Sequence, residues 1–398
     1  MNAGADVVIV GGSVAGAATA AFLAARGRRV TVLERARFPR DKPCGEGLMP
    51  HGVDVLAELG LLEAVRGAGG RELVGVRYLL PDGRSAAACF PAVPGRSSVA
   101  LGVRRLTLDA LLVEHAAGLP GVQFVQGVRV RGLRRTADGL MSATDGRQSW
   151  RGRVLVGADG VHSRVRCWLG WDAGRRWPRR YGAVGHVRFA QREPPPWIEV
   201  LLAPGLEAYL TPLGGGEALV ALLGGRALMR RFAGDLHGGF AAVLADQPLL
   251  RERLAGAELL PGVRATGPFA AEARRVAGTA ALLVGDAAGF LDPITGEGMA
   301  SALLQARAAA EVIDLALECR GRPDLRAYAR EYQRITRQGR RLTWLALALC
   351  SSPRLSSRAM GGLQRRPGLF DKLLAINSSR SGLDSLTFRD WLALLSGN

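Results

Sequence analysis

The sequence is poor in lysine: Lys42 and Lys372 are its only two, although the formal net charge is +18. Nearly all of the positive charge is therefore arginine, spread along the chain in short pairs without aromatic residues between them. Nucleic-acid-binding surfaces usually gather basic residues in one stripe and, for single strands, add stacking aromatics. We therefore predict a solvated arginine-rich surface and no nucleic-acid partner, although its field can attract an anionic small molecule.

Cysteine is also scarce, and its five copies are odd in number, far apart and free of CxxC spacing. This pattern argues against a disulfide framework and against a metal site, and it favours a reducing, cytoplasmic location. The first apolar run, residues 7–10, leads straight into a glycine turn, so we expect no signal peptide. No apolar stretch reaches about 18 residues, so we expect no membrane span. Serine-hydrolase, P-loop and zinc signatures are missing as well.

The composition that remains is that of an ordinary globular protein. The chain has 398 residues, of which 48% are apolar and 22% charged. That length is too great for one small core and fits two interleaved domains.

The N-terminus has the pattern of a βαβ unit. Residues 6–10 and 30–33 are typical of buried parallel strands, and residues 17–26 of an alanine-rich helix. The turn GGSVAG stands between the first strand and the helix. In a dinucleotide-binding unit the first glycine makes the tight turn and the last lets the helix approach the strand, so that the helix N-terminus faces a pyrophosphate. Gly11 and Gly16 suit these two roles.

Two further residues complete this first motif. Ser13 stands where GxGxxG would have its middle glycine, and it is small enough to allow close approach of a ligand. Glu34 ends the second strand, where a carboxylate can accept hydrogen bonds from an adenosine ribose.

A second motif, far downstream, favours FAD over NAD. Residues 281–284 form another buried strand that meets Gly285 and Asp286, and this acidic turn can place a carboxylate on the ribityl hydroxyls of a flavin. Pro293 and the Gly-Glu-Gly sequence at 296–298 lead into a long helix, residues 300–318. Its N-terminus would lie against the flavin edge where negative charge develops on reduction.

These motifs together resemble the flavoprotein superfamily of aromatic hydroxylases, flavin-dependent halogenases and geranylgeranyl reductases. The segments that carry the resemblance are VIVGGSVAGAATA with Glu34-Arg35, ADGVHSRVR, GDAAGFLDPITGEGM, and Arg105 with Asp109 in RLTLD. They occur in the family's order over roughly residues 5 to 310. The resemblance implies that Arg105 reaches the FAD pyrophosphate and that Asp159 lies near it, where the family uses the pyridine nucleotide.

The motifs and the resemblance define a set of expected site residues. The expected cofactor-binding residues are Gly11, Ser13, Ala15, Gly16, Glu34, Arg35, Cys44, Gly45, Arg105, Val130, Asp159, Gly285, Asp286, Pro293, Gly296, Gly298 and Met299. The expected substrate-pocket residues are Leu48, Met49, His186, Tyr209, Thr211 and Pro212.

The loop PRDKPCGEGLMP, residues 39–50, resembles the geranylgeranyl-reductase branch, where it runs beside the isoalloxazine. Cys44 is a candidate redox thiol, but the partner cysteine that disulfide-reducing flavoenzymes need is missing nearby. Glu46 is a candidate proton donor or base. His186 lies on an alternating strand and can point inward. A structural role is an equal or better interpretation for each of the three.

The predicted fold is α/β (α+β overall): a Rossmann-like FAD-binding domain, an inserted antiparallel-sheet substrate domain and a C-terminal helical region. Within it we expect one helix over residues 51–65 and a strand pair at 128–133 and 140–144. The predicted boundaries are 1–75, 100–170 and 275–340 for the FAD-binding domain, 76–99 and 171–274 for the substrate domain, and 341–398 for the helical region.

Several reactions fit a chain that binds FAD and carries no catalytic triad. We favour a monooxygenase that uses NADH or NADPH and O2 to hydroxylate or epoxidise an apolar aromatic, polyketide-like or terpenoid-like molecule of secondary metabolism. A prenyl-chain reductase is the alternative. A halogenase is disfavoured. The halogenases of this superfamily need a lysine above the tunnel for hypochlorous acid and usually a WxWxIP segment. Here the corresponding segment is EAYLTPL, without tryptophan, and Lys42 is the only lysine before residue 372. An inactive flavin-binding subunit is the non-enzymatic alternative.

The C-terminal stretches at 343–350 and 383–395 are apolar. They fit packing over the substrate pocket or at a dimer face, and also peripheral contact with a membrane. We expect a monomer or homodimer with a small-molecule substrate.

Overall fold

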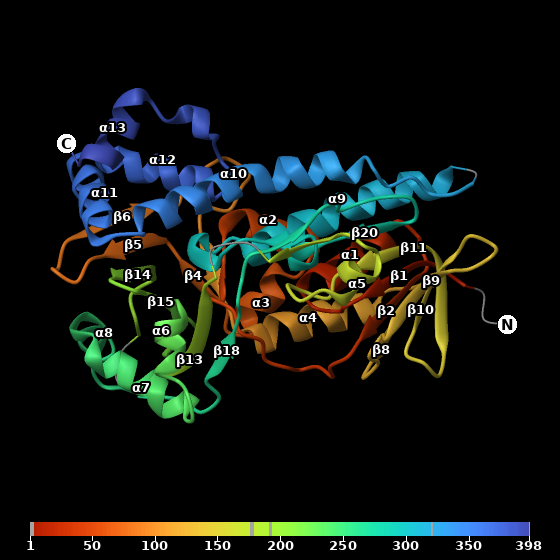
Figure 1. Cartoon of the computed structure of the whole chain (residues 1–398), viewed down its shortest axis with the longest axis horizontal. Helices are drawn as coiled ribbons and strands as arrows, with labels where there is room; N and C mark the ends of the chain where they lie inside the picture. Colours follow the sequence, from red (N-terminus) through yellow and green to blue (C-terminus); the bar gives the residue numbers. More distant parts are fainter. Residues whose placement is uncertain (1–3, 176–178, 191–192, 320, 398) are drawn as a thin grey trace.

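The computed structural model describes residues 4–175, 179–190, 193–319 and 321–397. Two large sheets lie side by side, and a group of helices from the C-terminal part of the chain covers the end remote from the N-terminus (Figure 1). This architecture confirms the predicted fold class, whereas the exact domain boundaries stay a prediction.

The first large sheet contains the N-terminal strand at its centre. Its order is β8-β2-β1-β11-β10-β9, and β20 pairs with β11. The pairs β1–β2, β1–β11, β2–β8 and β11–β20 are parallel. The strands are β1 (Ala5–Val10), β2 (Val30–Glu34), β8 (Val122–Gln126), β9 (Gly132–Arg135), β10 (Met141–Thr144), β11 (Ser149–Gly157) and β20 (Ala281–Leu283). β20 therefore joins this sheet late in the chain, parallel to β11, and its C-terminal end lies at the same edge of the sheet as the glycine turn after β1.

Helix α1 (Val14–Ala24) contacts both α4 (Arg105–Gly118) and α9 (Gly298–Glu318). It is buried almost all round, which its alanine-rich sequence allows because small side chains permit close packing of helix on helix and sheet. The shorter helices of this half are α2 (Pro50–Glu58), α3 (Leu62–Gly67) and α5 (Arg164–Trp168).

The second large sheet has the order β17-β13-β16-β15-β14-β5-β6, and β18 pairs with β13. It is antiparallel except for the parallel pair β14–β5. Its strands are β5 (Gly75–Leu79), β6 (Ser85–Cys89), β13 (Tyr181–Phe189), β14 (Trp197–Ala203), β15 (Leu206–Pro212), β16 (Glu217–Gly224), β17 (Ala257–Leu259) and β18 (Arg264–Thr266). Helices α6 (Arg226–Arg230), α7 (Leu236–Asp246) and α8 (Pro248–Arg253) belong to the same half.

Two small sheets join the halves. One contains β3 (Gly47–Leu48), β7 (Ala100–Gly102) and β4 (Arg71–Leu73). The other contains β12 (Asp172–Arg175), β19 (Ala271–Ala273) and β21 (Gly289–Phe290). Short 3-10 turns occur at η1 (Gly285–Ala287), η2 (Pro293–Thr295) and η3 (Leu383–Ser385).

The C-terminal helices are α10 (Tyr328–Leu349), α11 (Pro353–Arg365), α12 (Pro367–Asn377) and α13 (Phe388–Ser396). Figure 1 shows α10 lying along α9 and α11 and α12 beside β6, and α13 packs against α11. None of the helices in the described ranges combines the length and apolarity that crossing a bilayer needs.

Three local expectations were wrong in detail. The single helix expected over residues 51–65 is two helices, α2 and α3, because Gly60 takes a left-handed φ of +73° and ends the first. The strand expected from residue 128 begins only at Gly132, which leaves Val130 in a connection without regular structure. The second sheet is mixed rather than purely antiparallel, because β5 enters it from the N-terminal half of the chain beside β14.

Candidate flavin and substrate site

The glycine turn after β1 is packed too tightly to admit side chains. Gly11 has a φ of +101°, and a Cβ built on it would lie 2.4 Å from the carbonyl oxygen of Ala158. A Cβ on Gly16 would lie only 1.8 Å from the carbonyl oxygen of Gly11. These contacts bring the N-terminus of α1 against the end of β1. The Ser13 hydroxyl makes no capping hydrogen bond, so it leaves the first backbone N–H groups of α1 available to a ligand.

A buried ion pair lies beside this helix end. Arg105 and Asp109, which are 5% and 0% exposed, are joined by hydrogen bonds from Nε and Nη2 of the arginine, with Nη2 2.9 Å from Oδ2. Ser13 links to both: its Oγ accepts from Arg105 Nη2 at 2.8 Å and donates to Asp109 Oδ2 at 3.0 Å. Burial lowers the pKa of Arg105, but the neighbouring Asp109 outweighs it and holds the pKa above its ordinary value. The guanidinium is therefore a fixed positive charge at the α1 N-terminus.

Two more cations, which the sequence analysis did not select, lie at the same place. Arg40 Nη1 is 3.7 Å from Asp109 Oδ2. Lys42 lines the cavity, and its Nζ has no hydrogen-bond or ion-pair partner among the described residues. Burial and the nearby Arg105 lower the pKa of Lys42. The scarcity of lysine was the available signal, because one of only two lysines stands beside the PCGEGL loop.

Glu34 closes the other side of the turn. Its carboxylate accepts hydrogen bonds from the backbone N–H groups of Gly12 and Ala36, both at 2.8 Å. The side chain is 5% exposed at the end of β2, whereas Arg35 beside it is exposed. Glu34 thus ends the second strand, as the sequence predicts, and its carboxylate is hydrogen-bonded to the glycine turn.

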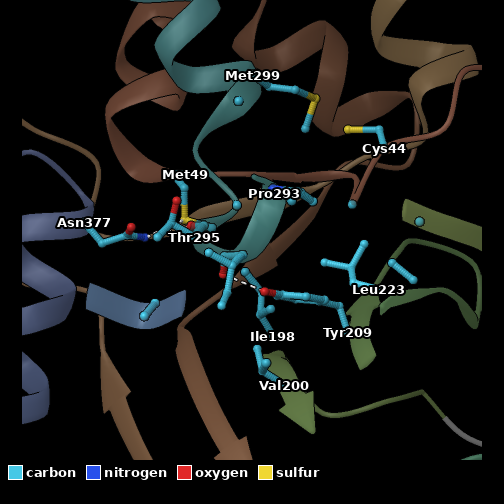
Figure 2. A pocket seen from close by; sticks show the side chains of 18 of the residues that line it. Cys44, Met49, Ile198, Val200, Tyr209, Leu223, Pro293, Thr295, Met299 and Asn377 are labelled. Atoms are coloured by element: carbon cyan, nitrogen blue, oxygen red, sulfur yellow. Dashed lines mark hydrogen bonds between the residues drawn. The ribbon is translucent and has the colours of Figure 1, made fainter. Parts of the chain in front are cut away.

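The downstream segment lies across from the helix N-terminus. Asp286, on η1 directly after β20, lines the same cavity as Ser13 and Arg105. The backbone N–H of Gly285 is held by Gln305 Oε1 of α9 at 2.8 Å, which fixes the turn to that helix. Pro293, on η2, and Met299, near the start of α9, continue the same wall (Figure 2).

The PCGEGL loop is anchored by a strained residue. Glu46 has a φ of +54°, and its carboxylate is buried at 1% exposure. Its Oε1 accepts from the backbone N–H of Arg105 at 2.8 Å, and its Oε2 lies 2.8 Å from His186 Nε2 on β13. The two residues that the sequence proposed separately are therefore one pair, which ties the loop to the second sheet.

Arg104 indicates which ring nitrogen of His186 donates to Glu46. Its Nη2 lies 3.4 Å from His186 Nδ1, and its Nη1 donates to Glu217 at 2.8 Å. A guanidinium can only donate, so Nδ1 accepts and the ring hydrogen stands on Nε2, facing Glu46. Glu46 then accepts two hydrogen bonds, which suits an anchor better than a proton donor.

A polar cluster joins the second sheet to η2. Tyr209 on β15 donates to Glu207 and lies 2.5 Å from the carbonyl oxygen of Ile294. Arg180 bridges Glu207 and Asp292, with its Nη1 2.8 Å from Asp292 Oδ1. Burial, only partly offset by Arg180, raises the pKa of Asp292 to about 7, and burial also raises the pKa of Tyr209 well above its usual value.

One cavity of about 320 Å³ connects these groups with the C-terminal helices. Cys44 and Met299 lie on one side of it, and Ile198 and Val200 on the opposite side (Figure 2). Beyond Tyr209 the lining passes to α10, α11, α12 and α13. The residues that these four helices contribute are Leu342, Leu345, Ala346, Leu349, Ser356, Ala359, Met360, Leu363, Phe370, Leu373, Leu374, Asn377 and Leu394. This half of the wall is almost wholly apolar.

The glycine turn after β1, Arg105 and the η1 segment with Asp286 are called the flavin cradle below, because comparison with known proteins identifies its ligand. Residues 4–202, half of the chain, match a family model described as an FAD binding domain. The chain belongs to this family of FAD-binding flavoproteins. It is 34% identical over 337 residues to a menaquinone reductase of Mycolicibacterium smegmatis, which covers 79% of this chain and 77% of that one. It is 28% identical over 323 residues to a 6-methylpretetramide 4-monooxygenase of Streptomyces rimosus, with 77% and 75% covered.

Solved structures support the same fold. A flavin-dependent brominase superposes with a TM-score of 0.80 at 20% identity, over 98% of this chain and 97% of that one. A probable FAD-dependent monooxygenase of Pseudomonas aeruginosa superposes with a TM-score of 0.67 at 26% identity, over 92% and 99%. The chain is thus an FAD-dependent oxidoreductase, in agreement with the sequence analysis.

The residues at the turn fit FAD on their own chemistry. The helix N-terminus and the charges of Arg40, Lys42 and Arg105 suit a diphosphate, and a lysine without a partner leaves a donor for it. Asp286, on the cavity wall, can accept from ribityl hydroxyls, and Glu34, at the end of β2 and off the cavity wall, can accept from an adenosine ribose.

The predicted site residues divide into two groups. Those on the cavity wall are Ser13, Ala15, Cys44, Gly45, Glu46, Met49, Arg105, Tyr209, Thr211, Gly285, Asp286, Pro293, Gly296, Gly298 and Met299. Those off the wall are Gly11, Gly16, Glu34, Arg35, Leu48, Val130, Asp159, His186 and Pro212.

Three residues of the second group have visible roles elsewhere. Leu48 is fully buried core, and His186 is bonded to Glu46. Asp159 accepts from Ser163 and from the backbone N–H of Arg164 at the start of α5. These three side chains support the residues of the cavity wall and are not part of its lining.

Proposed function

We propose that this flavoprotein reduces an isolated carbon–carbon double bond in the polyprenyl-type chain of a lipid-like substrate, with NADH or NADPH as the source of electrons. The observation that supports this proposal is one continuous cavity, which runs from Cys44 and Asp286 to the apolar faces of α10 to α13. A compact aromatic substrate would need only the half beside the flavin cradle. A long apolar chain uses both halves.

The lining supports a substrate that is recognised by its apolar surface. In the far half, leucine, alanine, methionine and phenylalanine side chains leave few groups that could orient a polar ring. Such a wall binds an isoprenoid chain by burying it, at roughly 25 cal/mol per Å² of apolar surface. The relatedness to menaquinone reductases, whose name denotes a quinone lipid, is consistent with this substrate class.

FAD, when bound and reduced, supplies the hydride. The chain itself holds the cofactor diphosphate with Lys42 and Arg105, places the substrate between Met299 and the β14 side chains, and keeps water out. The π bond breaks, one carbon takes the hydride and its neighbour takes a proton. Cys44 is the candidate for delivering that proton, because it lines the cavity whereas Glu46 and His186 are bonded to each other.

A monooxygenase remains the second candidate. The observation that favours it is the match to the 6-methylpretetramide 4-monooxygenase over three quarters of each chain. In that case Tyr209 and Thr211 would orient a ring, and the apolar half would hold its substituents.

Anaerobic turnover separates the two reactions. Enzyme, FAD, NADPH or NADH, and a geranylgeranyl-chain quinone in detergent are incubated without oxygen, and the mass of the product is measured by mass spectrometry. After the quinone ring has been re-oxidised in air, we expect a gain of two hydrogen atoms per reduced double bond of the chain. Product that forms only with oxygen, and that contains an added oxygen atom, would overturn the proposal and establish the monooxygenase.

A variant of the far wall tests the role of the cavity. Ala359→Trp, on α11, should abolish turnover of the geranylgeranyl substrate, while a geranyl analogue, with half the chain length, should still be reduced. Equal loss with both chain lengths would mean that the far half does not hold substrate. The short-chain activity also controls for misfolding.

A further inference from the structure

Helix α13 exposes apolar side chains to solvent. Phe388, Leu392 and Leu395 are 80%, 50% and 53% exposed. Their spacing of four and three residues puts them on one face of the helix. The opposite side contains Asp390, Ala393 and Leu394, which are buried. An amphipathic surface helix normally buries its apolar face, and this one presents part of it outward.

The exposed face is held rigidly. Thr387 and Asp390 form a capping box at the start of α13. Lys372 of α12 donates to Asp390 at 2.9 Å. A Cβ on Gly362 of α11 would lie 2.2 Å from the carbonyl oxygen of Ala393, so α11 and α13 are in direct backbone contact. The three side chains therefore project from a fixed platform.

The surroundings of α13 are basic. From residue 341 to the end, the chain has eight basic and three acidic residues. The helix packed against α13, α11, carries Arg354, Arg358 and Arg365, all exposed, and no acid. Arg389 is also exposed, on α13 itself. An apolar stripe flanked by arginines complements a surface with acyl chains below and phosphates above.

The same helix borders the cavity. Leu394 of α13 and Leu363 of α11 line its far end. The outward face of α13 and the apolar end of the cavity are thus two sides of one element, at the end of the molecule remote from the N-terminus (Figure 1).

We propose that α13 docks on the surface of an anionic lipid bilayer, with Phe388, Leu392 and Leu395 inserted at the boundary between headgroups and acyl chains and the arginines of α11 on the phosphates. A second copy of the chain fits this face less well. Three side chains bury on the order of 300 Å², against about 800 Å² per partner for a standard protein interface. Like-charged arginines would also face each other across a two-fold axis.

Bilayer docking goes beyond the proposed reaction and does not depend on it. Only its use, the delivery of a lipid-like substrate into the cavity beneath α13, rests on the proposed function. The two fail separately, because binding to vesicles is measured without turnover and turnover is measured in detergent without vesicles.

Vesicle flotation tests the docking face. The FAD-loaded protein is mixed with vesicles of phosphatidylglycerol and phosphatidylcholine, or of phosphatidylcholine alone, and floated through a density gradient. We expect the wild type to float with the anionic vesicles. The triple variant F388N/L392N/L395N should bind at least tenfold more weakly. Leu315→Asn, at a leucine that is 65% exposed on α9, should bind like the wild type.

The α11 arginines and the folding of each variant are tested separately. The variant R354Q/R358Q/R365Q should lose the preference for anionic lipid, and every variant should keep its bound FAD and its turnover in detergent, which shows that it folds. The proposal is overturned if the wild type does not float, or if the triple variant floats equally well. It is also overturned if light scattering shows that the triple substitution halves the molar mass, since the face would then be a dimer interface.

Discussion

Replacing Glu46 by glycine has two opposite effects on stability: it relieves backbone strain, and it removes the carboxylate that anchors the PCGEGL loop. A residue other than glycine in the left-handed region costs about 1–2 kcal/mol. Glycine removes this cost but adds about 0.5–1 kcal/mol of unfolded-chain entropy. The backbone part of Glu46→Gly should therefore stabilise the protein by about 0.5 kcal/mol.

Loss of the carboxylate lowers the free energy of unfolding, and this effect is larger than the gain from the backbone. Glu46 accepts buried hydrogen bonds from the Arg105 N–H and from His186, both at 2.8 Å. Hydrogen bonds to a charged group contribute about 1.5–3 kcal/mol each, and their loss leaves buried donors unsatisfied. We expect Glu46→Gly to lower the free energy of unfolding by about 3 kcal/mol, measured by urea denaturation at pH 7.

Ser379 provides the matched control. It also has a positive φ, +56°, but it is exposed, and its hydroxyl makes no hydrogen bond within the described residues. Ser379→Gly should show the backbone part alone, a gain of about 0.5 kcal/mol. If Glu46→Gly is as stable as the wild type or more so, the carboxylate is not an anchor and the reasoning is refuted.

Three further predictions concern the cofactor cradle. Asp286→Ala should purify colourless, and unchanged flavin absorbance would contradict its assignment to the ribityl chain. Gly16→Ala, whose Cβ would lie 1.8 Å from a carbonyl oxygen, should lose about 2 kcal/mol or more of stability. Gly118→Ala, at a helical position with open space around it, should instead gain about 0.5–1 kcal/mol, and equal stabilities of the two variants would refute the close packing. Burial raises the pKa of Glu297 to about 8 from 4.5, so the unfolded chain releases this proton first and stability falls as pH rises from 4.5 to 8. Glu297→Gln should flatten that decline in denaturation at pH 6.5 and 8, and an unchanged slope would show that Glu297 does not cause it.

The parts of the site that sequence predicted are those specified locally. The turn at Gly11 to Gly16 and the segment at Asp286 to Gly298 each follow a buried strand, and their glycines are required by contacts within a few residues or at the adjoining strand end. Their order along the chain then selected FAD. The fold class followed from the same strand and helix patterns.

The rest depends on contacts between distant segments. Glu46 and His186 are 140 residues apart, and each alone has several ordinary roles. Lys42 becomes a cofactor candidate only because the loop places it beside Arg105. The apolar runs of α10 and α13 have the same composition whether they pack a core or line a cavity, so the length of the cavity could not be read from them.

The flavin cradle also links cofactor binding to folding. Its pieces, the turn after β1, Arg105 on α4 and the η1 segment, come together only when the first sheet and α9 are assembled, so the unfolded chain has no equivalent site. Free FAD will therefore raise the free energy of unfolding by about 1.4 kcal/mol for each tenfold excess over its dissociation constant. Flavin release during heating then reports unfolding of the first sheet together with α9.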